Sequence, residues 1–231
     1  MTTTGHRTRP ERSGVRHVLD RMRKLDAELP AHDGLAVFNR VYLAVTEDIA
    51  RRSAAGWFRD PPAATALGVR FAGLYLAAVD AAEAGRRTAA CWRPLFQLRR
   101  HPGVRPVQFA LAGINAHIGH DLAVAVVSTC TALGCEPERL RGDYDRIDAV
   151  LLDLEERVRE ELMPGPDLLE VADPLTHLTG SWCLARARDG AWAASEVLWA
   201  LRGSATLREE FREGLDATVG MAGRFLLTPL G

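Results

Sequence analysis

Apolar residues recur along most of this chain at intervals of three and four, the period of a helix that packs on one side. In the first such segment the stripe runs through Val18, Met22, Leu25 and Leu29, and Pro30 then stops the helix. The pattern predicts helices near residues 15–29, 35–55, 63–84, 90–100, 107–133, 144–162 and 206–227. No segment combines strand alternation with hairpin turns. We therefore expect an all-α bundle of about seven to nine helices.

The predicted helix over 107–133 differs from the others because apolar residues surround it on every side. A helix of this kind is buried by its neighbours, so we expect it at the centre of the bundle. Its middle nevertheless carries the polar residues Gln108, Asn115, His117, His120 and Asp121. Because a buried polar group without a partner costs about 1–3 kcal/mol, these side chains need either partners or a function.

Three of these residues are potential metal ligands on one side of the helix. At about 100° of rotation per residue, His117, His120 and Asp121 share one stripe. Imidazole and carboxylate ligands suit zinc, manganese or iron, and three protein ligands leave a position open for water. The stripe thus predicts a divalent-metal site in a hydrolase that acts on a small molecule. A further ligand or base would come from Asp143, Asp48, Asp80 or His177, and we assign Asp143 and His117 as the catalytic candidates.

Two other interpretations remain open. The polar residues can line a metal-free pocket for a small metabolite, in a binding protein or a cofactor-free biosynthetic enzyme. The candidates for such a pocket are Asn39, Tyr42, Arg70, Tyr75, Gln108 and Asn115. In the third interpretation the residues form a structural or interaction network, in which Asp121 pairs with Arg70 or Arg93 while Gln108 and Asn115 join helices.

Composition narrows the partners that we expect. The 231 residues are 47% hydrophobic and 26% charged with a net charge of -1, which disfavours a nucleic-acid or membrane partner and leaves a small-molecule ligand or substrate. The longest uninterrupted apolar run, Leu122 to Val127, is too short to cross a bilayer. We expect a disordered polar tail over 1–13 and a single cytoplasmic helical domain over 14–231, with a homodimer left open.

Motifs of other enzyme classes are missing from the sequence. It contains no glycine-rich phosphate loop, no nucleophile elbow and no dinucleotide fingerprint. The spacing of Cys91, Cys130, Cys135 and Cys183 contains no C-x-x-C pair, so we interpret the cysteines as buried free thiols.

Several spaced segments resemble one protein family. They are the strings Val37-Phe-Asn-Arg-Val-Tyr-Leu43, Val69-Arg-Phe-Ala-Gly-Leu-Tyr-Leu76, Cys91-Trp-Arg-Pro-Leu-Phe96, Gln108-Phe-Ala-Leu-Ala-Gly-Ile-Asn-Ala-His-Ile118, Asp121-Leu122 and Asp143-Tyr144. Over roughly residues 15 to 230 the chain is similar to the actinobacterial domain-of-unknown-function family number 5995. The resemblance implies a small cytoplasmic helical protein, and it transfers no catalytic residue.

Overall fold

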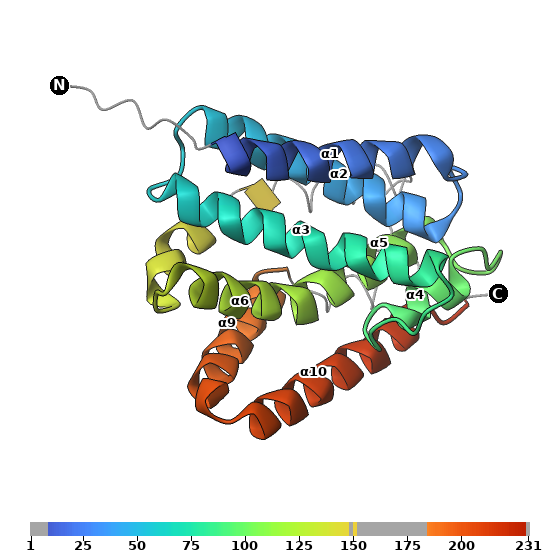
Figure 1. Cartoon of the computed structure of the whole chain (residues 1–231). Coiled ribbons are helices and arrows are strands. Elements are labelled where there is room, and N and C mark those ends of the chain that lie inside the picture. The colour runs from blue at the N-terminus through green and yellow to red at the C-terminus, as the bar shows by residue number, and fades with distance from the viewer. Residues whose placement is uncertain (1–8, 148–149, 152–183, 230–231) are drawn as a thin grey trace, which may run out of the picture.

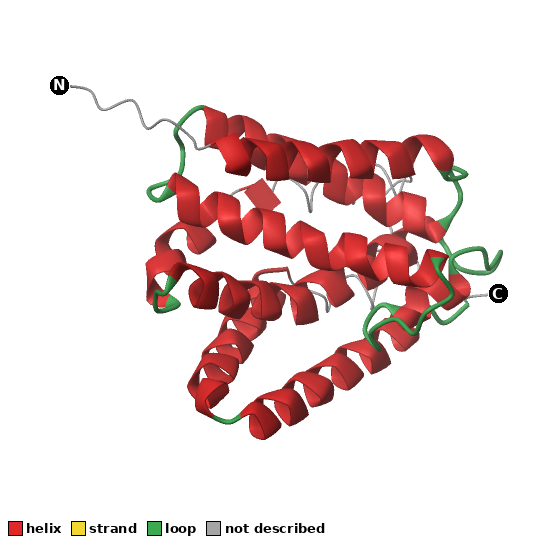
Figure 2. Ribbon diagram, viewed as in Figure 1, coloured by secondary structure: helices red, strands yellow, loops and turns green. Residues whose placement is uncertain are grey.

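The computed structural model describes residues 9–147, 150–151 and 184–229. The α-helices with defined limits within these ranges are α1 (Arg9–Glu28), α2 (Gly34–Ala54), α3 (Pro61–Glu83), α4 (Arg93–Leu98), α5 (Pro106–Ala116), α6 (Leu122–Leu133), α9 (Leu184–Ala200) and α10 (Ala205–Leu226). Residues 138–147 are also helical. Helices and loops account for all of the described ribbon in Figure 2, and no strand occurs there. The predicted all-α fold class is thus confirmed.

Local capping interactions fix several helix ends. The side chain of Asp33 accepts a hydrogen bond from the backbone N–H of Leu35 at 3.0 Å, which starts α2. Asp60 does the same for the N–H of Ala63 at 3.1 Å, and proline in the first turn supports the start of α3. Because these signals are local in sequence, the limits expected for both helices agree closely with the structure.

Two limits differ from the expectation. Helix α1 begins at Arg9, so residues 9–13 are helical and the predicted tail over 1–13 extends too far. We placed the start of this helix from its apolar stripe, and that stripe begins after Arg9. The residues before the stripe are polar, but a polar segment with proline in its first turn can also be helical. The predicted helix over 144–162 is helical at 144–147 and 150–151, and its remainder lies outside the described residues.

The predicted central helix is the axis of the bundle. Helices α5 and α6 are joined by the turn η1 (His117–Asp121) into one rod. Helices α2 and α10 pack against α5, while α3 and α9 pack against α6. In Figure 1, α1 and α2 lie above α3, and α9 and α10 lie below α6. The polar residues of η1 are therefore at the middle of the molecule.

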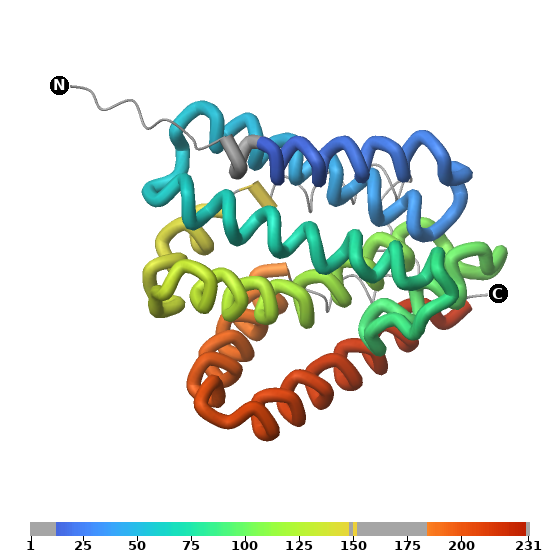
Figure 3. Tube along the Cα trace, in the orientation of Figure 1, coloured from blue at the N-terminus to red at the C-terminus, as the bar shows by residue number. Residues whose placement is uncertain are grey.

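The C-terminal helices close the lower side of the bundle. The trace in Figure 3 shows α9 and α10 diverging like the arms of a V, with a 3₁₀ turn at Leu201–Gly203 between them. Ser204 caps α10 through the N–H of Leu207. From this turn α10 runs back to contact α4 and α5, which brings residues of the C-terminal helix next to η1.

A glycine permits the close approach of α2 and α5. A Cβ atom built at Gly113 would overlap the ring of Phe38, which is itself 1% exposed. The missing side chain lets this ring lie between the helices, where its centroid is 6.1 Å from that of His117. This contact helps to form the wall around the His117 ring.

Two described helices are long and apolar enough to cross a membrane, namely α3 and the rod Pro106–Leu133. The sequence analysis considered only uninterrupted apolar runs. It did not detect these two helices because glycine and polar residues interrupt the apolar residues in both. In the rod, 78% of the apolar window is buried inside the bundle, as in a core helix, and in α3 39% is buried. Core helices of soluble proteins pass the same test, so cytoplasmic localisation stays a prediction.

Candidate functional site

The carboxylate of Asp121 is the centre of a buried polar cluster. Its Oδ2 accepts a hydrogen bond from the indole N–H of Trp92 at 2.9 Å and lies 3.1 Å from Nδ1 of His117. Its Oδ1 lies 2.9 Å from Nδ1 of His120. Each of these four side chains belongs to a residue less than 5% exposed. One carboxylate therefore holds three side chains at once.

The local backbone explains how two histidines reach the same carboxylate. Residues His117–Asp121 form a π-helical turn, which is wider than an α-helical turn by one residue. The turn places His117, four residues before Asp121, at one oxygen of the carboxylate and the adjacent His120 at the other. Such turns inside long helices are frequent at functional sites.

The protonation states follow from the hydrogen bonds. Burial alone would raise the pKa of Asp121, but hydrogen bonds from His117 and His120 hold this pKa below its usual range. The carboxylate is then ionised at neutral pH and can only accept, so both Nδ1 atoms carry hydrogen. Burial lowers the pKa of His117, so its ring is neutral and keeps a lone pair on Nε2. Both Nε2 atoms are buried without a hydrogen-bond partner among the described residues.

This burial predicts a dependence of stability on pH. Burial lowers the pKa of His117 below the usual 6.5, more strongly than Asp121 raises it. At pH values between the lowered pKa and 6.5 the unfolded chain binds more protons than the folded chain, so stability falls as the pH falls through this window. We expect a loss of up to about 1.4 kcal/mol per pH unit from this residue.

Urea unfolding at about pH 7.5 and about pH 5.5 measures this loss. In the variant His117→Phe the loss should be smaller, because neither state then titrates at this position. A variant with the same pH dependence as the original chain would show that His117 is not buried in its neutral form.

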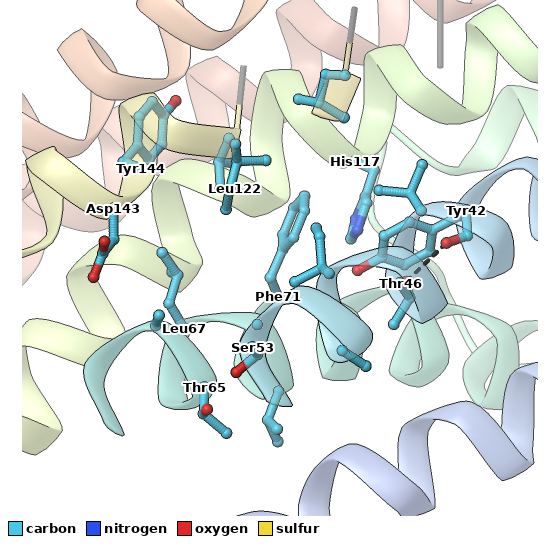
Figure 4. A pocket seen from close by; sticks show the side chains of 18 of the residues that line it. Tyr42, Thr46, Ser53, Thr65, Leu67, Phe71, His117, Leu122, Asp143 and Tyr144 are labelled. Atoms are coloured by element: carbon cyan, nitrogen blue, oxygen red, sulfur yellow. Dashed lines mark hydrogen bonds between the residues drawn. The ribbon is translucent and has the colours of Figure 1, made fainter. Parts of the chain in front are cut away.

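An apolar cavity of about 140 Å³ adjoins His117. Residues of α1, α2, α3, the central rod and the helical residues 138–147 and 150–151 line it, and most of these side chains are apolar. The His117 ring stacks on Phe71 with centroids 3.6 Å apart and an interplanar angle of 6°. Its centroid is 4.4 Å from that of Tyr42. Figure 4 shows His117 reaching into the space between these two rings.

Asp143 lines the same cavity from a different place. In Figure 4, Leu67, Phe71 and Leu122 lie between Asp143 and His117. The Asp143 carboxylate accepts hydrogen bonds from the backbone N–H groups of Arg59 and Asp60, both at 2.8 Å. The structure thus gives the carboxylate a capping role at the start of α3. It places the two residues that we assigned as catalytic at one cavity without bringing them together.

Two predicted pocket residues connect helices instead. Asn39 donates to the carbonyl of Met22 at 2.9 Å and accepts from the hydroxyl of Tyr75 at 3.1 Å. Both Asn39 and Tyr75 are fully buried, and neither is among the residues that line the described cavity. They join α1, α2 and α3, whereas Tyr42 does line the cavity.

Gln108 and Asn115 attach the C-terminal helix to the central rod. Gln108 donates to the carbonyls of Leu226 and Thr228, both at 2.8 Å, and Asn115 donates to the carbonyl of Val219 at 3.0 Å. The expectation that these two amides join helices is therefore confirmed.

The arginine partners that we considered for Asp121 are wrong. Arg70 donates to the carbonyl of Ala66 at 3.3 Å, and Arg93 donates to the carbonyl of Thr88 at 3.3 Å. The Asp121 carboxylate is bonded instead to the indole N–H of Trp92 and to Nδ1 of both histidines. The charge of Asp121 suggested an arginine as its partner. Its partner from outside the turn is instead Trp92, which lies 29 residues earlier in the chain.

The remaining candidates for a further ligand lie elsewhere. Asp48 pairs with Arg51 and Arg52 on α2, and Asp80 pairs with Arg21 of α1. His177 lies outside the described residues. The metal site predicted for His117, His120 and Asp121 stays a prediction, although both oxygens of Asp121 already accept hydrogen bonds.

Two residues of the site were missed in the sequence. A buried tryptophan needs an acceptor for its N–H, so the polar helix next to it could have suggested Trp92. For Phe71 the sequence offers no signal beyond an apolar position in α3, and its stacking on His117 depends on the tertiary packing.

The comparisons with known proteins agree with the family resemblance. The model of a family described as a family of unknown function, DUF5995, matches residues 15–229. The chain belongs to this family. Neither the curated proteins nor the solved structures gave a match. Membership in DUF5995 therefore leaves the function to be argued from the site, and an actinobacterial source stays a prediction.

Proposed function

We propose that this DUF5995 protein binds a small, mostly apolar molecule in the cavity beside His117. Nε2 of His117 would accept a hydrogen bond from a hydroxyl or N–H group of the ligand. The supporting observation is that this atom is buried and has no hydrogen-bond partner within the described part of the chain. Such an atom costs about 1–3 kcal/mol in the empty protein, and a bound donor removes this cost.

The cavity sets the size of the ligand. A volume of about 140 Å³ is similar to that of an engineered apolar cavity of about 150 Å³ in another protein, which binds benzene. Aromatic edges and faces from Phe38, Tyr42 and Phe71 surround the His117 ring. A single ring that carries one hydrogen-bond donor matches both the volume and the walls.

A binding role fits the hydrogen bonds better than the metal-dependent hydrolase expected from the sequence. A metal shared by His117, His120 and Asp121 would have to replace the hydrogen bonds between Nδ1 of both histidines and the Asp121 carboxylate, because these Nδ1 atoms already face its two oxygens. A ligand at Nε2 of His117 leaves both of these hydrogen bonds in place. We therefore favour the metal-free interpretation for this cavity.

General-base catalysis is a second candidate function at the same atom. Nε2 of His117 can take a proton from a bound ligand, and the ionised Asp121 would stabilise the imidazolium that forms. The supporting observation is the hydrogen bond between Nδ1 of His117 and Asp121. In this case the variant His117→Phe would abolish turnover of a ligand that it still binds.

Phenol and anisole form a matched pair of probes, because they have similar shapes and phenol alone has a hydrogen-bond donor. We expect the chain to bind phenol about tenfold more tightly than anisole, the value of one hydrogen bond to a buried acceptor. Isothermal titration or ligand-detected NMR measures both Kd values.

The variant His117→Phe keeps an aromatic ring against Phe71 and removes the acceptor, so its preference for phenol should disappear. A matched control is His32→Phe, because His32 is exposed and outside the cavity lining. Equal affinities for the two probes in the original chain, or a preference that survives in His117→Phe, would contradict the proposal.

A further inference from the structure

Three potential metal ligands meet where α10 passes the segment that precedes α4. They are Cys91, His120 and Asp216, and their ligand atoms all lie within 4.8 Å of one another. Cys91 is 1% exposed and His120 is 4% exposed, whereas Asp216 is partly exposed. The three residues come from distant parts of the sequence and belong to no spacing motif. This group is separate from the cavity, since none of its members lines that cavity.

His120 is the residue that points to a ligand. Its Nδ1 is hydrogen-bonded to Asp121 at 2.9 Å, which leaves Nε2 as the ring atom available for binding. This Nε2 is buried and has no hydrogen-bond partner in the described ranges 9–147, 150–151 and 184–229. A carboxylate behind an imidazole is also the usual support of a metal-bound histidine, because it fixes the tautomer and the ring orientation.

The backbone around Cys91 holds the Asp216 carboxylate in place. One oxygen of Asp216 accepts from the N–H of Ala90 at 2.8 Å, and the other accepts from the N–H of Cys91 at 2.9 Å. One turn further along α10, a Cβ at Gly220 would overlap the carbonyl of Ala90. The glycine therefore lets α10 approach closely enough for the carboxylate to reach this backbone.

We propose that Cys91, His120 and Asp216 bind a zinc ion. Sulfur, nitrogen and oxygen ligands in one set suit this metal, and three protein ligands leave a fourth position for water or a small molecule. Tetrahedral zinc at bond lengths of about 2.0–2.3 Å separates its ligands by roughly 3.5 Å. The three ligand atoms lie within 4.8 Å of one another, so the widest pair has to contract by up to about 1.3 Å. The thiol of Cys91 releases its proton to solvent as the sulfur–metal bond forms.

The test uses the full-length chain without a histidine tag, treated with a chelator and then titrated with cobalt(II) as a coloured substitute for zinc. We expect one equivalent to bind and to produce the thiolate-to-cobalt charge-transfer band in the near ultraviolet. Zinc should then displace cobalt and remove the band. The band reports a cysteine ligand directly in the original chain, so this part of the test does not depend on the folding of any variant.

Variants identify which cysteine binds the ion and test whether Asp216 and His117 take part. Cys91→Ser should lose the band and weaken zinc binding by more than about 100-fold, beyond the typical effect of an outer hydrogen-bond partner. Asp216→Asn should weaken zinc binding as well. The matched control is Cys130→Ser, because Cys130 is a buried cysteine outside this group. His117→Phe should keep the band, so loss of the cavity function and loss of the metal site are distinguishable.

Three results would overturn the proposal: no saturable cobalt or zinc binding, cobalt binding without a thiolate band, or a band that persists in Cys91→Ser. Loss of the ion in His117→Phe together with its retention in Cys91→Ser would also overturn it, and would assign the metal to His117, His120 and Asp121. Circular dichroism melts in chelator check that each variant is folded before the comparison is made.

Discussion

Replacing Asp121 by alanine is expected to lower the free energy of unfolding by about 3–5 kcal/mol, among the largest effects of a single substitution. The substitution leaves the N–H groups of Trp92, His117 and His120 buried without their acceptor. Each such group costs about 1–3 kcal/mol, and rearrangement of the rings recovers part of the sum. The expected loss is large because these three donors are buried. Donors at the surface would form hydrogen bonds with water once the carboxylate was removed.

Urea unfolding of the variant Asp121→Ala measures this loss through the midpoint and the slope. The control is Asp48→Ala, which removes a carboxylate paired with Arg51 and Arg52 near the surface of α2. Surface ion pairs contribute about 0–1 kcal/mol, so the control should change little. If the two variants lost the same amount, Asp121 would not be the acceptor that stabilises the cluster.

Replacing Gly113 by alanine is expected to cost about 3 kcal/mol. The added Cβ overlaps the ring of Phe38 and lies 2.9 Å from the Cβ atom of that residue, so a rotation of the ring alone cannot relieve the contact. Phe38 also packs against Tyr75 and Trp92, with ring centroids 5.2 Å and 5.4 Å away. Overpacking of this kind typically costs about 1–3 kcal/mol, and we expect the upper end because the neighbours are aromatic and buried.

The matched control, Gly214→Ala, is expected to raise the stability of the chain instead of lowering it. Gly214 lies within α10, and among the described residues no atom lies within 4 Å of a Cβ built there. Alanine at this position should stabilise the chain by about 0.5–1 kcal/mol through helix propensity. Thermal unfolding of both variants should therefore move Tm in opposite directions. A stable Gly113→Ala variant would mean that α2 and α5 can separate without loss of packing.

Features that depend on neighbours in sequence were predictable. Asp33 and Asp60 each directly precede a helix, and each accepts a hydrogen bond from an N–H two or three residues ahead, a capping pattern that is local in sequence. The pairing of His117 with Asp121 is also local, since four residues along a helix bring side chains together. The sequence therefore identified the polar centre of the molecule, together with the helix that carries it.

Contacts between distant segments were not predictable from the chain. Polar residues such as Gln108 signal that a buried partner exists, but the partner is a backbone carbonyl near the end of α10. Backbone carbonyls occur at every residue, so composition cannot select one. The contact between Cys91 and Asp216 was not predictable either, because the two residues are 125 positions apart and only the packing of the helices brings them together.

The wide turn at His117–Asp121 also changes the register of the central rod. Because the turn holds one residue more than an α-helical turn, every side chain of α6 is rotated by about 100° from its place in an uninterrupted helix. On either side of the turn the rod has different neighbours, α2 and α10 before it and α3 and α9 after it. The turn thus lets each half of the rod present its side chains to its own pair of helices. His117 and His120 lie in the turn between the two halves.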